Sequence, residues 1–282
     1  MAKADDHYTR VAEKLIEKLK EGAAPWQKPF DADGDGTPPM NSTTGKRYRG
    51  GNMIHLMLQD HRDPRWMTYR QALEAGAQVK EREEGTPIIY WKFEEEQVVP
   101  GEGGDLVTVE LERPRSFLSY VFNGEQIEGL PPFLAEKPRE CDVVRAEKLL
   151  EASGATIINR SQASAFYKKD QDTIYLPKKE QFPSEAMYYS TALYELGHWT
   201  GHESRLNREF GPFGSMTYAK EELRAKISGM MLSVELGIGQ SADNHAAYVQ
   251  GWIKALEDDP RELFRAAADA EKILNYVMSM SA

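Results

Sequence analysis

Residues 194 to 198 read YELGH and bring three reactive side chains close together if the stretch is helical. Glu195 and His198 are three residues apart, and Tyr194 and His198 are four apart, so all three lie near one another on the helix surface. The pattern differs by one residue from H-E-x-x-H, in which two imidazoles one turn apart bind a single metal ion. The stretch therefore indicates an altered zinc site, a site that has lost its chemistry, or a chance match.

A second acidic pair follows on what we predict to be another helix. Glu221 and Glu222 are followed one turn later by Lys226. A catalytic zinc ion needs a third protein ligand and an open coordination position, and we predict Glu222 as that ligand. Glu195 would then be the general base that takes a proton from metal-bound water. Alternatively, the two glutamates are solvated charges near the start of a helix, where acids are favoured.

His202, four residues after His198, allows a different set of ligands. In that alternative His198, His202 and Glu222 bind the metal, and Tyr194 is a fourth contact. A phenol has a pKa near 10 and is a weak zinc ligand unless it is ionised. Lys226 adds a positive charge one turn after Glu222, close to the expected cation. We therefore predict that zinc, the one cofactor indicated, binds weakly or not at all.

Residues 45 to 70 combine positive charge with aromatic side chains. Proteins hold single-stranded nucleic acid in this way, with cations along the backbone and flat rings under the bases. The residues that we predict to bind DNA are Lys46, Arg47, Tyr48, Arg49, Asn52, Arg65, Trp66 and Tyr69. The alternative is a basic surface loop beside a hydrophobic core to which Trp66 belongs.

The composition of the 282-residue chain, with 40% hydrophobic and 28% charged residues, is that of a soluble globular protein. A net charge of -10 argues against a surface coated in positive charge for duplex DNA, but it allows a local basic groove. A single cysteine excludes an internal disulfide and a cysteine-based zinc cluster. Neither a membrane span nor a secretory signal is evident, so we expect a cytoplasmic protein.

The elements that must position these residues form an α+β pattern with two domains. We predict a helix over residues 184 to 200 with Ser184 as its N-cap, and a long helix over residues 217 to 237. In the first half, TPIIYWKF, LVTVELERP and RSFLSYVFN are expected to form three strands. The GLPP and KPRE segments interrupt the pattern, so we place the domains at 1–135 and 136–282.

Several blocks of the sequence resemble the ArdC-type antirestriction proteins of conjugative plasmids, a family related to the leading part of TraC-type plasmid primases. In chain order the blocks are APWQKP, NSTTGKRYRGGN, PRWMTYRQA, VFNGEQIEGLP, ELGHWTGHESRLNR, YAKEELRAKI and HAAYVQGWIKAL. The resemblance covers nearly the whole chain. It implies an N-terminal domain that binds single-stranded DNA, a C-terminal domain with a zincin-like metallopeptidase fold, and a role against host restriction when DNA enters a recipient.

Two departures from this family fall on the presumed metal site. The family reads HELGHWTGH where this chain reads YELGHWTGH, and EELRAE where it reads EELRAK. The resemblance implies Glu195 as general base, with His198 and Glu222 as ligands, whereas Tyr194 and Lys226 do not match.

We therefore predict an antirestriction protein that binds the single-stranded DNA of an incoming plasmid or phage and whose metal site is weakened. A host restriction protein is a candidate partner. Two alternatives stay open. One is an active zinc metallopeptidase that cleaves a host protein, and the other is a replication or primase accessory module.

Overall fold

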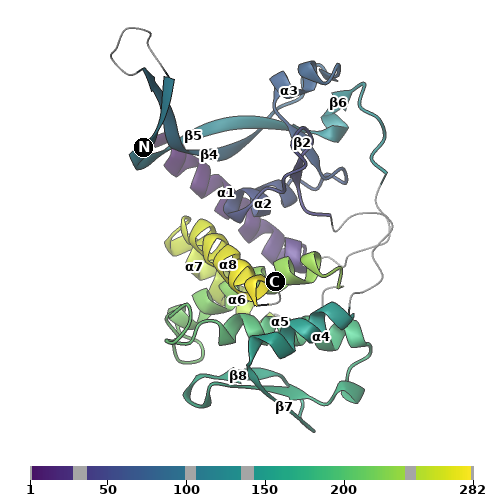
Figure 1. Cartoon of the computed structure of the whole chain (residues 1–282), viewed down its shortest axis with the longest axis vertical. Coiled ribbons are helices and arrows are strands. Elements are labelled where there is room, and N and C mark those ends of the chain that lie inside the picture. The colour runs from purple at the N-terminus through teal and green to yellow at the C-terminus, as the bar shows by residue number, and fades with distance from the viewer. Residues whose placement is uncertain (1, 28–36, 99–105, 135–142, 239–245, 281–282) are drawn as a thin grey trace. The chain divides into compact units, whose positions relative to one another are not determined.

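A computed structural model of the chain describes residues 2–27, 37–98, 106–134, 143–238 and 246–280 (Figure 1). Its helices are α1 (Ala2–Lys20), α2 (Gly50–Met57), α3 (Tyr69–Glu74), α4 (Val143–Ser153), α5 (Glu185–Trp199), α6 (Met216–Glu235), α7 (Ala246–Asp258) and α8 (Glu262–Ser279). Its strands are β1 (Met40–Asn41), β2 (Arg65–Met67), β3 (Gln78–Val79), β4 (Thr86–Val98), β5 (Leu106–Asn123), β6 (Ile127–Glu128), β7 (Thr156–Arg160), β8 (Phe166–Lys168) and β9 (Thr173–Pro177). No helix in these ranges is both long and apolar enough to cross a bilayer.

The described residues group into two compact units that are interleaved along the sequence. Unit 1 comprises Met1–Pro39, Arg47–Pro64 and Pro132–Ala282, and unit 2 comprises Met40–Lys46 and Arg65–Pro131. The boundary that we predict near residue 135 falls in residues 135–142, outside the described residues. Unit 1 nonetheless contains α1 and α2 as well as the helices α4 to α8, so it combines residues from both sides of that boundary.

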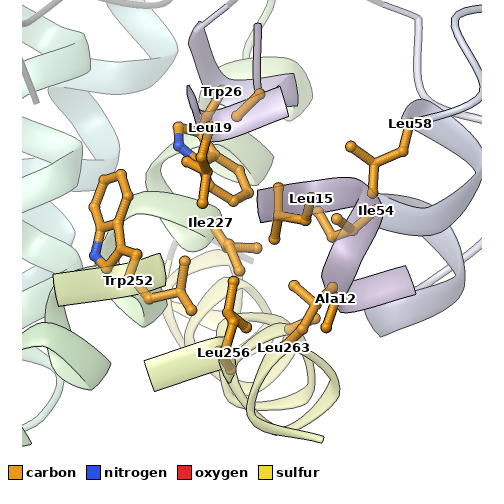
Figure 2. Close-up of a cluster of buried hydrophobic side chains, with 14 of the residues drawn as sticks. Ala12, Leu15, Leu19, Trp26, Ile54, Leu58, Ile227, Trp252, Leu256 and Leu263 are labelled. Atoms are coloured by element: carbon orange, nitrogen blue, oxygen red, sulfur yellow. The ribbon is translucent and has the colours of Figure 1, made fainter. Parts of the chain in front are cut away.

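One hydrophobic core of unit 1 joins helices from both halves of the sequence (Figure 2). Val11, Leu15, Ile16 and Leu19 recur at helical spacing and form an apolar stripe along α1, and all four are buried in this core. Residues of α2, α6, α7 and α8 complete it, among them Ile54, Ile227, Trp252, Leu256 and Leu263. The N-terminal helices are therefore part of the same packed layer as the C-terminal ones.

A second hydrophobic core of unit 1 surrounds α5. Leu193 and Leu196 of α5 are fully buried there together with Ile174 and Leu176 of β9. Strand β9 is the centre of a three-stranded sheet with the order β7-β9-β8, in which β7 is parallel to β9 and β8 is antiparallel. Helix α5 is thus held from several sides, which fixes the side chains that it carries.

Unit 2 is built on a sheet with the order β1-β2-β5-β4 and a small second sheet formed by β3 and β6. Strands β4 and β5 form a long antiparallel hairpin, and β5 is one continuous strand where we expected two. The register between them shifts after Lys92, which marks a bulge. Helix α3 begins at a capping box formed by Thr68 and Gln71.

Candidate functional site

Helix α5 carries the YELGH residues on a buried face. The helix begins where predicted, since the Ser184 side chain accepts a hydrogen bond from the Met187 backbone N–H at 3.3 Å. Glu195 is 5% exposed and His198 is 7% exposed. Acidic and basic side chains are seldom this buried unless they have partners inside the protein, so their neighbours decide what they can do.

Helix α6 crosses α5 closely at this point and brings two glutamates to His198. A glycine at position 197 permits the approach, because a Cβ atom there would lie 2.9 Å from Ser228 Oγ. Glu221 Oε1 is 3.2 Å from His198 Nδ1, and Glu222 Oε1 is 3.7 Å from His198 Nε2. The structure therefore brings Glu222 to His198, and it adds Glu221 on the opposite ring nitrogen.

Arg208 holds Glu221 in place from the loop between α5 and α6. Its Nε and Nη2 atoms donate to the two Glu221 oxygens at 2.9 and 2.7 Å. The same guanidinium donates to the Gly197 carbonyl at 2.7 Å and to Thr200 Oγ1 at 2.8 Å. Burial raises the pKa of Glu221, but the hydrogen bonds from Arg208 and His198 outweigh it, and the pKa is lowered. Glu221 is thus a buried carboxylate that orients the imidazole.

The charge around His198 favours its protonated form. Burial lowers the pKa of His198, but the charge of Glu222 and the hydrogen bond to Glu221 raise it to about 9. With both ring nitrogens protonated, Nδ1 donates to Glu221 and Nε2 points toward Glu222. Carboxylates on both sides of the ring therefore stabilise an imidazolium.

The Tyr194 hydroxyl donates a hydrogen bond to Glu222 Oε2. Burial raises the pKa of Tyr194 well above its ordinary value, and the charges of Glu222 and Glu195 raise it further. The phenol therefore stays neutral and acts as a proton donor, so Glu222 is already hydrogen-bonded from within the protein. The Lys226 ammonium lies 5.7 Å from the centre of the Tyr194 ring, so a buried cation lies beside the phenol.

These residues do not fit a zinc ion held by three protein ligands. Among the residues that the structure describes, His198 Nε2 and the Glu222 carboxylate are the two strong donors brought together on this side of the ring, and zinc is normally held by three or four. Within the described ranges, no three histidine, cysteine, aspartate or glutamate side chains are grouped so that they could hold a metal ion. His202 lies beyond the end of α5, where its Nδ1 atom is 2.9 Å from Ser204 Oγ. The roles of Glu195, His198 and Glu222 in catalysis or metal binding stay predictions.

The residues that we predicted to bind DNA are divided between the two units. Arg47, Tyr48, Arg49 and Asn52 belong to unit 1, and Lys46, Arg65, Trp66 and Tyr69 belong to unit 2.

The prediction that Trp66 binds DNA is wrong. Trp66 is only 1% exposed, so no base can stack on it as we had expected, and its alternative place in a hydrophobic core is the one observed. Tyr48 also packs against a core, whereas Tyr69 is 48% exposed. Arg47 forms a 2.6 Å ion pair with Glu235. Among these residues, Tyr69 is therefore the aromatic ring most accessible to a ligand.

Comparison with known proteins explains both halves of the chain. Residues 144–269 match a family described as a zincin-like metallopeptidase, and residues 5–122 match the N-terminal domain of anti-restriction factor ArdC. The metal-free crystal structure of the antirestriction ArdC protein from plasmid R388 is 34% identical, with a TM-score of 0.75 over 97% of both chains. The chain belongs to the ArdC antirestriction family. The family resemblance and the two-domain α+β fold expected from the sequence are thereby confirmed.

Other relatives of this ArdC-family chain differ in length. Two Escherichia coli proteins named DNA primase TraC are each 57% identical over 96% and 95% of this chain, which spans 27% and 20% of their lengths. An uncharacterised protein of Sinorhizobium fredii, y4eC, is 32% identical, and the match covers 91% of it. A Mn(II)-bound structure of the R388 ArdC protein matches at 33% identity with a TM-score of 0.74 over 98% of both chains.

Proposed function

We propose that this ArdC-family chain binds the single-stranded DNA of an incoming plasmid or phage and shields it from restriction in the cytoplasm of the recipient. The observation that carries the proposal is the match to an antirestriction protein over nearly the whole of both chains. Exposed cations such as Lys46 and Arg49, together with the exposed ring of Tyr69, support contact with DNA. A host restriction protein is a further candidate partner.

We also propose that the zincin-like part of the chain has a weakened metal site and little or no peptidase activity. Two features support this: the Tyr194 hydroxyl already donates to Glu222, and Lys226 lies beside the phenol ring. Restriction would then be countered by covering DNA rather than by cleaving a host protein. The Mn(II)-bound structure of the R388 protein favours the alternative, a metal-dependent activity that this chain would share.

The TraC relatives support a second candidate function. At 57% identity, this chain corresponds to about a quarter of a protein named DNA primase. A module that holds single strands would also serve replication. Because this accessory role and the antirestriction role both need a surface for single strands, DNA binding is the property to test first.

The test is a comparison of binding to single-stranded and duplex DNA. We expect the full chain to bind a labelled oligonucleotide of about 20 nucleotides more tightly than the same sequence as a duplex, measured by fluorescence anisotropy. The affinity should fall as salt rises, because each neutralised phosphate releases counterions. Equal or tighter binding to the duplex, or no binding to either, would contradict the proposal. Protection of unmodified DNA entering a restricting host then separates the antirestriction role from the accessory role.

A further inference from the structure

The β4–β5 hairpin of unit 2 presents two unusual cross-strand pairs on one of its faces. Tyr90 of β4 lies directly opposite Phe117 of β5, and two residues further along, Lys92 lies opposite Arg115. Alternate residues of a strand point to the same face, so the four side chains share one face of the hairpin. An aromatic pair is thus followed immediately by a pair of cations.

This face is accessible to a ligand. Tyr90 is 59% exposed and Phe117 is 50% exposed, although large aromatic side chains usually bury most of their surface. Arg115 is exposed and Lys92 is half-buried. The preceding residue of β4 on this face, Ile88, is buried, so the exposed pairs begin where the packed part of the hairpin ends.

The two cations of this face are direct cross-strand neighbours. Like charges directly opposite each other on neighbouring strands destabilise a sheet, and the register places Lys92 against Arg115. A surface that keeps such a pair beside two exposed rings favours a ligand with several negative charges and flat apolar groups. The cationic part is short, because the register shifts after Lys92 and the next pair is Glu94 opposite Glu110.

The opposite face of the same hairpin lacks this combination. Trp91 and Tyr120 are 47% and 57% exposed there, but the residues opposite them are Ser116 and Pro87. The exposed aromatic area is therefore similar on the two faces, and the cross-strand pair of cations distinguishes the first. The two faces form a matched comparison within a single hairpin.

We infer that the face formed by Tyr90, Lys92, Arg115 and Phe117 is a stacking surface for single-stranded nucleic acid. The rings lie under unpaired bases, and the two cations contact the adjoining phosphates. Duplex DNA does not suit this surface, because its bases stack on one another and their faces are not accessible. The inference rests on the proposed binding of single strands, and it assigns the contact to residues outside the basic run at 45 to 70.

The first experiment measures binding of the full chain to a fluorescein-labelled oligothymidylate of about 20 nucleotides. The double variant Tyr90→Ala/Phe117→Ala should weaken binding at least about fivefold for each base that loses its stacking partner. The control is Trp91→Ala/Tyr120→Ala, which removes equally exposed aromatic rings from the other face. This control should bind as the parent does.

A second pair of changes tests the cations without removing any ring. Lys92→Gln/Arg115→Gln should flatten the slope of log affinity against log salt by about 0.7 for each lost phosphate contact. Lys92 is half-buried and Arg115 is exposed, so circular dichroism should show native structure in this variant.

The outcomes separate this inference from the proposed function. A parent chain that does not bind the oligothymidylate would refute the proposed function. A different outcome is that the parent chain binds the oligothymidylate while Tyr90→Ala/Phe117→Ala and Lys92→Gln/Arg115→Gln bind it as tightly as the parent. In that case the proposed function stands, but the assignment of the contact to this face is wrong. Greater loss in the Trp91→Ala/Tyr120→Ala control would place the contact on the opposite face and overturn the inference.

Discussion

Charged and aromatic side chains have opposite surroundings at the crossing of α5 and α6 and on the Tyr90–Phe117 face of the β4–β5 hairpin. At the crossing, the buried Glu221 meets His198, which is also buried, and the partly buried Arg208, and the buried Glu222 meets the hydroxyl of the partly buried Tyr194. On the hairpin, two rings are exposed and two cations lie opposite each other. The partners in the first region come from within the protein, whereas this face of the hairpin presents exposed rings beside two cations.

The groups at the crossing that would hold a metal ion have hydrogen-bond partners within the protein. A metal ion would need the groups that now hydrogen-bond to one another, so binding must compete with the hydrogen bond from Tyr194 and the charge of Lys226. Buried carboxylates without any partner would be very unfavourable. The internal partners therefore stabilise the crossing of the helices in the absence of a metal ion.

The largest expected effect is a gain of metal binding when both departures are reversed. Tyr194→His/Lys226→Glu restores the H-E-x-x-H pair and removes a nearby cation, and each strong ligand regained should raise zinc affinity by orders of magnitude. We expect about one zinc per chain by elemental analysis after purification without chelator. The melting temperature should also rise with added zinc, because a ligand of the folded state stabilises it.

The control for this change is Tyr194→Phe, which removes the hydroxyl without adding a ligand and should gain no metal. The same analysis should be run with manganese, since a relative binds it. A parent chain that already carries a full equivalent of either metal would contradict the weakened site. A double variant that ignores both metals would show that other residues prevent binding.

Removal of the guanidinium at the helix crossing should have the next largest effect. Arg208→Met leaves the Glu221 carboxylate, which is 3% exposed, without its bidentate partner, and this should lower the free energy of unfolding by about 3–5 kcal/mol. Urea denaturation measures the change. Arg70→Met is the control, because Arg70 pairs with Glu74 on the surface and should change stability by about 0.5 kcal/mol or less. A loss below about 1 kcal/mol for Arg208→Met would mean that the crossing does not depend on this ion pair.

The smallest effect is expected on the hairpin, and it should have the opposite sign. Lys92→Gln/Arg115→Gln removes two like charges that lie opposite each other, so stability should stay the same or rise by about 0.2–1 kcal/mol. The same denaturation experiment measures it. A clear loss of stability would show that the two cations support the fold, and the contrast between the two regions would then fail.

Local features of the structure were predictable from the sequence. The Ser184 cap and the apolar stripe of α1 depend on residues within a few positions of one another, so propensity and periodicity reveal them. The bulge in the hairpin was not predicted, and the continuous strand β5 was read as two. The pairing of β5 with β4 is interrupted near Pro114, but the strand itself continues. Sequence patterns do not distinguish such a break in pairing from a turn between two strands.

The candidate sites were predictable only in part. The spacing of Glu195 and His198 followed from helical geometry, and the approach of Glu222 to His198 was predicted from the third ligand that a zinc site needs. The role of Glu221 was missed, although it is adjacent to Glu222, because only the angle at which α6 crosses α5 decides which ring nitrogen each carboxylate meets. Trp66 was misread because a basic and aromatic stretch looks the same whether its rings face solvent or a core.

By itself, the sequence determined the membership of the family, the main helices and the two unusual residues at the presumed metal site. These properties depend on the identity and order of neighbouring residues. The tertiary structure alone decided that Arg208 clamps Glu221, that Trp66 is buried, and that Tyr90 and Phe117 form a pair beside Lys92 and Arg115. Such contacts join residues distant in the sequence, and their geometry is set by the packing of whole elements rather than by local preference.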